Sequence, residues 1–234
     1  RDHTERLFAF LGIPCTRRDS AVTVFPCGEI PGGRWRIPGD FSAAAFWLVA
    51  AALRPDSEVR IARCGLNPTR TGALEVLRRM GLEVRIENEG ESGGEPEGDL
   101  VVRSSPLSGT KITPEEIPLL VDELPVLAVA ATQAHGVTEI RGAAELRVKE
   151  CDRLAAVTEG LCALGGDVEE REDGWIIRGG KALHGGRVRT FGDHRIAMAF
   201  AVAGLGAKGP VEIDDPRCVA ISYPRFFETL EALT

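Results

Sequence analysis

Residues 145–153 form a dense group of charged side chains with the potential to do chemistry. The stretch ELRVKECDR places six charged residues in nine positions, just before a helical apolar pattern over residues 154–164. Residues three and four apart share a helix face, so Arg153 is expected beside Lys149 and Glu150. A helix N-terminus already carries about half a positive charge. Added cations there favour a bound anion, and the alternative is a solvated first turn with ion pairs.

The stretch ELRVKECDRL at 145–154 closely resembles the signature of the 5-enolpyruvylshikimate-3-phosphate synthase family, in which a Ser more often stands at the place of Cys151. Other stretches that resemble this family follow the same order along the chain: RDHTE at 1–5, PGDFS at 38–42, NPTRTG at 67–72, DELP at 122–125, GDHRIAM at 192–198 and SYPRF at 222–226. Together they cover the whole chain. Several collinear motifs are far more specific than any one of them.

The resemblance implies a reaction of the shikimate pathway of aromatic amino-acid biosynthesis, at the step that glyphosate targets. The family transfers the enolpyruvyl group of phosphoenolpyruvate to the 5-hydroxyl of shikimate 3-phosphate, through a tetrahedral adduct that loses phosphate. Both substrates are multiply anionic. The site therefore needs several cations, a base for the hydroxyl and an acid for the methylene carbon. The resemblance implies no metal and no cofactor.

Two carboxylates match the catalytic acids and bases of the family. Asp122 matches the acceptor of the 5-hydroxyl proton, and its alternative role is an N-cap for the following helix, which Asp fills well. Glu150 matches the proton relay at the methylene carbon, and its alternative role is one half of an ion pair. The sequence alone leaves both alternatives open.

Five further residues match the substrate-binding residues of the family. Lys149 matches a ligand of shikimate 3-phosphate, while Arg153 and Arg195 match the pair that holds phosphoenolpyruvate. Two Arg suit such anions because the guanidinium fork binds carboxylate or phosphate bidentately. Arg1 matches a position that reaches the shikimate ring or its phosphate. His194 is expected to have a secondary, orienting role.

Some positions depart from the family pattern or carry no expected chemistry. Ile221 stands where some members have a Lys that contacts phosphate. The Lys-Ser pair, a further Arg and the Gly-rich loop of the family would all lie upstream of Arg1. The residues Asn67, Thr69 and Arg70 are interpreted as a cap and first turn.

Composition excludes several classes of function. The chain of 234 residues is 44% hydrophobic, which is enough for a sizeable core. Its longest apolar run, at 43–53, is too short for the roughly 20 residues that span a membrane. A net charge of -7 disfavours nucleic acid as a partner. Six scattered Cys form no metal or disulfide pattern, so we expect reduced thiols in a cytoplasmic protein.

The elements that position these residues follow from apolar patterning. Helices that are apolar on nearly every side, and must therefore be buried, are expected at 41–53, 124–131 and 196–205. Amphipathic helices are expected at 69–80, 149–164 and 223–233. The strands between them alternate with charged residues and keep one face in water. Buried helices and half-solvated strands predict an inside-out α/β fold, with helices inside and sheets outside.

The pattern repeats about every 70 to 80 residues, with an Asp at 40, 122 and 193. This agrees with the inside-out α/β barrel of βαβαββ units that the resemblance implies. We expect residues 1–37 to end the other domain and residues 38–234 to form the C-terminal domain, with an incomplete third repeat. The chain would then be the C-terminal part of a longer enzyme, inactive alone and dependent on the missing N-terminal part.

Smaller elements are predicted from local signals. A helix is expected at 3–11, strands at 21–25 and 34–37, and a mobile hairpin loop without chemistry at 87–99. Two other functions remain as alternatives. One is an enolpyruvyl transferase acting on UDP-N-acetylglucosamine, and the other is a noncatalytic binding module derived from the same domain.

Overall fold

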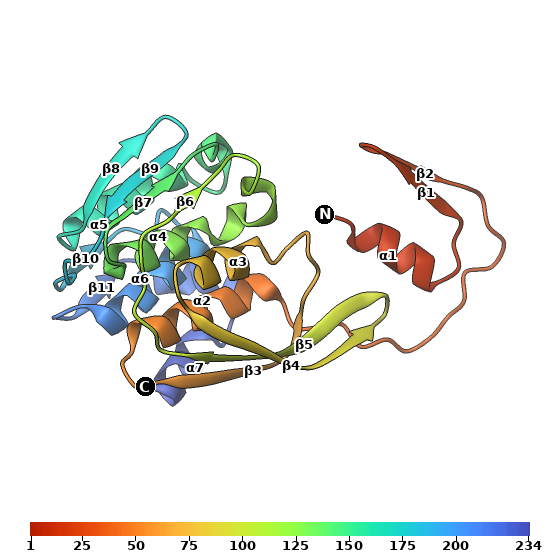
Figure 1. The fold of residues 1–234 in the computed structure, drawn as a ribbon, viewed down its shortest axis with the longest axis horizontal. Coiled ribbons are helices and arrows are strands. Elements are labelled where there is room, and N and C mark those ends of the chain that lie inside the picture. Colours follow the sequence, from red (N-terminus) through yellow and green to blue (C-terminus); the bar gives the residue numbers. More distant parts are fainter.

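Three apolar helices form the centre of the computed structural model, which describes residues 1–234. They are α2 (Phe41–Leu53), α4 (Leu124–Gln133) and α6 (His194–Gly206). Each of the three contacts the other two. Nearly all side chains of α2 and α4 are buried, because these helices have no polar face to turn to water. Figure 1 shows them between the sheets.

Three sheets lie outside these helices, as the alternating strands predict (Figure 1). The first sheet has the order β3-β5-β4, with strands β3 (Glu58–Gly65), β4 (Glu83–Ser92) and β5 (Glu95–Arg103). The second has the order β6-β7-β9-β8, with strands β6 (Lys111–Ile112), β7 (Val137–Ile140), β8 (Asp167–Arg171) and β9 (Gly174–Arg178). The third contains only β10 (Gly186–Val188) and β11 (Val211–Ile213), which run parallel.

The chain repeats one βαβαββ unit. The second unit shows it in full as β6-α4-β7-α5-β8-β9, with β6 parallel to β7 and the last two strands antiparallel. In the first unit, a single parallel bridge from Gly39 to Cys64 replaces the opening strand. The outer helices are α3 (Gly72–Arg79), α5 (Arg153–Ala163) and α7 (Phe226–Leu233). The predicted inside-out arrangement is confirmed.

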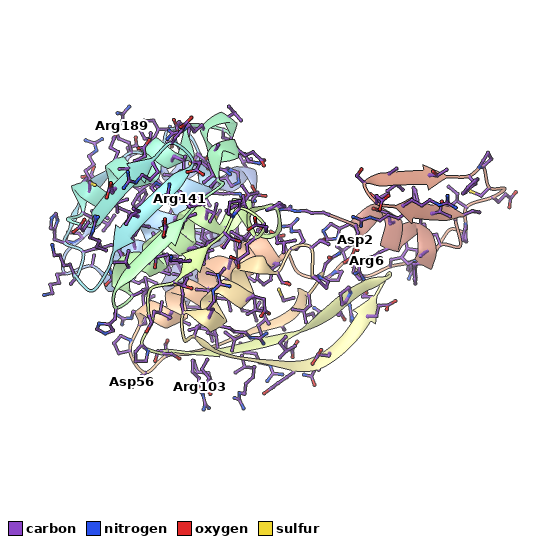
Figure 2. All side chains as sticks on the ribbon, turned by 45° about the horizontal axis from the view of Figure 1, so that its top comes forward. Asp2, Arg6, Asp56, Arg103, Arg141 and Arg189 are labelled. Atoms are coloured by element: carbon purple, nitrogen blue, oxygen red, sulfur yellow. The ribbon has the colours of Figure 1, made fainter.

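Residues 1–37 project to one side of the repeats (Figures 1 and 2). They contain α1 (His3–Phe10) and a hairpin of β1 (Cys15–Arg18) with β2 (Ala21–Val24). His3 Nδ1 lies 2.8 Å from Glu95 Oε1 at the tip of the first sheet, which joins this segment to the rest. The assignment of this segment to another domain stays a prediction.

Two of the smaller predictions need correction. Residues 34–37 form no strand. Residues 87–99 form the expected hairpin but no long loop, because β4 and β5 continue as an antiparallel ladder to a two-residue turn at Gly93 and Gly94. Both glycines have positive φ, of 63° and 83°, which is the backbone that tight hairpin turns require.

Three outer helices begin later than the apolar pattern predicts. Helix α5 begins at Arg153, because the side chain of Asp152 caps it by accepting from the N–H of Ala155. Residues Ala144–Val148 form a separate 3₁₀ helix. Helices α3 and α7 likewise begin three residues after their predicted starts. No helix of the fold combines the length and apolarity needed to cross a membrane.

Candidate functional site

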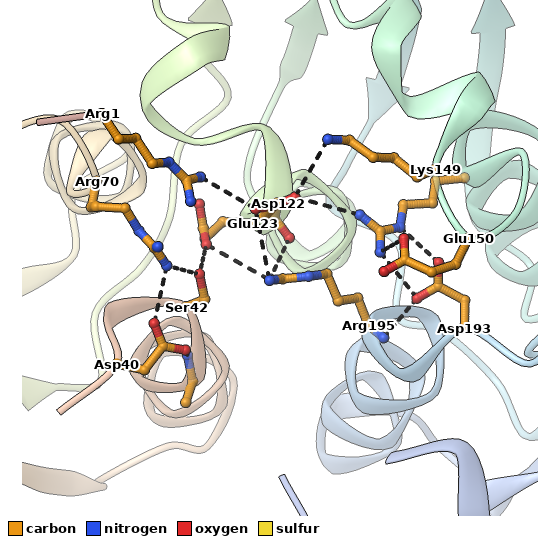
Figure 3. Close-up of polar contacts among 12 residues, drawn as sticks. Arg1, Asp40, Ser42, Arg70, Asp122, Glu123, Lys149, Glu150, Asp193 and Arg195 are labelled. Atoms are coloured by element: carbon orange, nitrogen blue, oxygen red, sulfur yellow. Dashed lines mark hydrogen bonds and ion pairs between the residues drawn. The ribbon is translucent and has the colours of Figure 1, made fainter. Parts of the chain in front are cut away.

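The three inner helices begin at the same place. Residues at their first turns touch one another: Ser42 of α2 contacts Glu123 before α4, and Arg195 of α6 donates to the carbonyl of Asp122 at 3.1 Å. Figure 3 shows the helices nearly end-on, with the charged side chains gathered over their ends. Each helix N-terminus contributes partial positive charge, so this end of the fold favours anions.

Asp122 lies at the centre of four cations (Figure 3). Its two carboxylate oxygens lie within 4 Å of a nitrogen from each of them: Arg1 at 3.2 Å, Arg153 at 3.6 Å, Arg195 at 3.8 Å and Lys149 at 3.9 Å. These residues come from the N-terminal segment and from the second and third repeats. The structure thus brings together five of the residues singled out from the sequence.

Asp122 does not cap the helix that follows it. It lies in a 3₁₀ turn, Val121–Glu123, and α4 has no side-chain cap. Burial alone raises the pKa of this carboxyl, but Arg195, Arg1 and Lys149 outweigh burial and hold the pKa below its ordinary value. The capping alternative is therefore wrong, and Asp122 is an ionised group facing the cluster.

Arg153 is buried and rigidly held, with only 1% of its side chain exposed. Its Nε donates to Asp193 Oδ2 at 2.7 Å and its Nη2 donates to Glu150 Oε2 at 2.6 Å. Its Nη1 has no hydrogen-bond partner. A buried donor without a partner costs free energy, so this nitrogen is well placed for a ligand beside Asp122.

Lys149 and Glu150 lie just before α5, and Glu150 stands beside Arg153 as expected. Lys149 also pairs with Glu145. Glu150 is half-exposed and bonded to Arg153, so the ion pair considered from the sequence is present. His194 is buried at the start of α6, where burial and neighbouring Arg195 lower the pKa of its imidazole. The neutral imidazole is therefore favoured.

Asp193 has a larger part in the site than its sequence position suggested. It caps α6 by accepting from the N–H groups of Arg195 and Ile196, and it also binds the guanidinium of Arg153. Burial raises the pKa of Asp193, but the bond to Arg153 brings it below its ordinary value. One buried carboxylate therefore fixes two of the cationic residues.

Sequence reasoning also missed Glu123, Ser42 and Arg70, which form a chain of contacts beside Arg195 (Figure 3). Arg70 was interpreted as part of a first turn, but α3 begins two residues later and Arg70 donates to Asp40 and Ser42. The adjacent acidic pair at 122 and 123 was the available signal, because Glu rarely occurs in a buried position without a role.

A cavity of about 200 Å³ opens next to this cluster, between the start of α2 and the N-terminal segment. Asp40 and Arg70 belong to its lining. Asn67 lies there too, bonded to Asp2, Glu95 and Thr69 instead of capping α3. No group of three or more His, Cys, Asp or Glu side chains is arranged to hold a metal ion.

Comparison with known sequences decides the family. The sequence model of EPSP synthase (3-phosphoshikimate 1-carboxyvinyltransferase) matches residues 1–230. The chain belongs to the EPSP synthase family. It is 53% identical over 233 residues to the 3-phosphoshikimate 1-carboxyvinyltransferase of Desulforudis audaxviator and 47% identical to that of Shouchella clausii. Both matches cover all of this chain but only 54% of the relative, so the chain spans about half the length of these EPSP synthases.

Solved structures agree with this assignment. An EPSP synthase from Acinetobacter baumannii superposes with a TM-score of 0.95 at 40% identity, over 100% of this chain and 54% of that one. The enolpyruvyl transferase NikO from Streptomyces tendae superposes with a TM-score of 0.62 at 24% identity, over 82% of this chain and 42% of that one. The second match supports the fold alone.

Proposed function

We propose that this chain supplies one half of the active site of an EPSP synthase. The reaction would transfer the enolpyruvyl group of phosphoenolpyruvate to the 5-hydroxyl of shikimate 3-phosphate and release phosphate. The observation that carries the proposal is the ring of four cations around Asp122, at the joint N-termini of the three inner helices. Membership of the EPSP synthase family agrees with such a site for two anionic substrates.

The catalytic roles are proposed as follows. Asp122 accepts the proton of the 5-hydroxyl, since it is ionised and one-fifth exposed toward the cluster. Glu150 relays a proton at the methylene carbon. It is half-exposed and bonded to Arg153, so bound substrate must displace water before it can act as an acid.

The binding roles are proposed from the cations and their anchors. Arg153 and Arg195 hold phosphoenolpyruvate, and Nη1 of Arg153, which has no hydrogen-bond partner, is directed to it. Lys149 and Arg1 bind shikimate 3-phosphate. His194 orients the start of α6 between Asp193 and Arg195.

Activity is proposed to require the part of the relatives' length that this chain does not match. The cations here face substrates that together carry two phosphates and two carboxylates. Charge interactions worth several kcal/mol in a dry site fall to about 1 kcal/mol in bulk water, so a half-site open to solvent binds weakly. Positioning of the second substrate is lost as well.

The test measures phosphate release from phosphoenolpyruvate and shikimate 3-phosphate. The chain is assayed alone and then with the unmatched part of the Desulforudis audaxviator relative, supplied as a second polypeptide. We expect no turnover by the chain alone and turnover by the reconstituted enzyme. Replacing shikimate 3-phosphate with UDP-N-acetylglucosamine should abolish turnover. The proposal would be overturned if the reconstituted enzyme released phosphate only with UDP-N-acetylglucosamine, or released no phosphate with either acceptor.

A further inference from the structure

Glu123 is a buried acid at the edge of the cluster, with 1% of its side chain exposed. Its Oε1 accepts from the hydroxyl of Ser42 at 2.5 Å, and its Oε2 has no hydrogen-bond partner. Burial raises the pKa of this carboxyl above its ordinary value, and the Ser42 hydroxyl and the charge of Arg195 oppose this rise only in part. A buried acid in this setting costs stability, so its presence calls for a role.

Glu123 belongs to the second repeat and lies between residues of the first and third repeats. Ser42 belongs to α2 and also accepts from Arg70 at 2.7 Å. On the other side, Arg195 of α6 places its Nη1 3.8 Å from Glu123 Oε1 and 3.1 Å from the carbonyl of Asp122. Figure 3 shows the line from Arg70 through Ser42 and Glu123 to Arg195.

We propose that Glu123, held in place by Ser42, is a positioning residue for Arg195. Its carboxylate keeps the guanidinium against the start of α4, so that the remaining N–H groups of Arg195 point into the cluster. The inference rests on the proposed function, in which Arg195 holds phosphoenolpyruvate. In this proposal Glu123 acts through Arg195 and not by contact with that substrate.

Positioning and simple electrostatics predict opposite results. Removing a negative charge beside an anion site strengthens anion binding if charge alone matters. If the carboxylate positions Arg195, its removal frees a long side chain and weakens binding. The direction of the change in phosphoenolpyruvate affinity therefore separates the two roles.

The kinetic experiment uses Glu123→Gln in the reconstituted enzyme. We expect the KM for phosphoenolpyruvate to rise on the order of tenfold, with the KM for shikimate 3-phosphate and kcat nearly unchanged. Ser42→Ala removes no ionisable side chain but releases Glu123, and it should raise the same KM. Ser42→Thr keeps the hydroxyl and should restore the wild-type value.

The matched control is Glu159→Gln on α5, a half-exposed acid whose ion-pair partner is Arg189. It should leave both KM values unchanged. A lower or unchanged KM for phosphoenolpyruvate in Glu123→Gln, with an active wild type, would overturn this inference and leave the proposed function standing.

A second measurement does not depend on activity. In ¹⁵N NMR spectra of the chain, the Nε–H signal of Arg195 can be assigned by its loss in Arg195→Lys. We expect this signal to move and broaden in Glu123→Gln and in Ser42→Ala, but to stay unchanged in Glu159→Gln. An Arg195 signal indifferent to all three substitutions would refute the positioning role even if the reconstituted enzyme had no turnover.

Discussion

Arg153 makes contacts that an ammonium group cannot reproduce together. Its guanidinium binds Asp193 and Glu150 and still directs Nη1 at the cluster. We expect Arg153→Lys to raise the KM for phosphoenolpyruvate by about tenfold or more, or ~1.4 kcal/mol of binding, although the charge is kept. Steady-state kinetics of the reconstituted enzyme measures this KM. An unchanged KM would remove Arg153 from the site.

Substitution of Asp122 can separate a catalytic role of this residue from a role in stability. It caps no helix, so Asp122→Asn should leave the fold intact. The amide cannot accept a proton, and we expect kcat to fall by roughly 10²-fold to 10⁴-fold. Circular dichroism melting of the chain and turnover of the reconstituted enzyme give the two readings. Normal turnover per folded molecule with a lowered melting temperature would contradict the catalytic role.

In the first sheet, Asp99 of β5 binds both neighbouring strands where their register shifts. Its carboxylate accepts from the N–H of Arg63 in β3 and from the side chains of Arg60 and Asn88. Both neighbouring strands shift register here, and Arg63 and Asn88 have positive φ. The bonds from Arg63, Arg60 and Asn88 lower the pKa of Asp99 to about 2.

This pKa has a defined consequence for stability. Because the folded pKa lies below the ordinary value of 3.8, ionised Asp99 stabilises the fold above pH 3.8, and this contribution is lost as pH falls toward about 2. We expect Asp99→Asn to lower the melting temperature at pH 7, and the gap from wild type to close between about pH 4 and 2. A gap independent of pH would show that the charge of Asp99 contributes nothing.

Helices α5 and α6 pack closely at Gly160. A Cβ at this position would lie 2.1 Å from Cζ of Phe200. Gly160→Ala gains up to about 1 kcal/mol in helix propensity, but overpacking costs roughly 1–3 kcal/mol. We expect net destabilisation in urea unfolding, smaller when Phe200→Leu is added. If Gly160→Ala lowered the free energy of unfolding equally with and without Phe200→Leu, this contact would be ruled out as the cause.

The elements could be predicted where the apolar pattern of a whole segment allows only one arrangement. Helices α2, α4 and α6 were found because they have no polar side, and an apolar helix can only be buried. Their neighbours were placed less well. The start of α5 depended on the cap from Asp152, and the turn at Gly93 and Gly94 lies in a polar stretch that resembled a longer loop.

At the scale of the whole molecule, the site could be predicted only in part. The cations Lys149, Arg153 and Arg195 stood out through their motifs, as did Asp122. Glu123 and Ser42 did not, because their importance arises from a contact between residues 81 positions apart. Local patterns carry no information on such pairs. Sequence therefore predicted the residues that face the cluster better than the buried residues behind them.

The assembly of the cluster around Asp122 also bears on the order of folding. Arg1 lies 121 positions from Asp122 in sequence, and Arg195 lies 73 positions from it. Contacts of this kind form only after long loops have closed, which is slow compared with the growth of helices and hairpins. In refolding, we expect the far-ultraviolet helical signal to recover before the Arg195 resonance does. Simultaneous recovery would mean that the helices and the contacts between the three units form together.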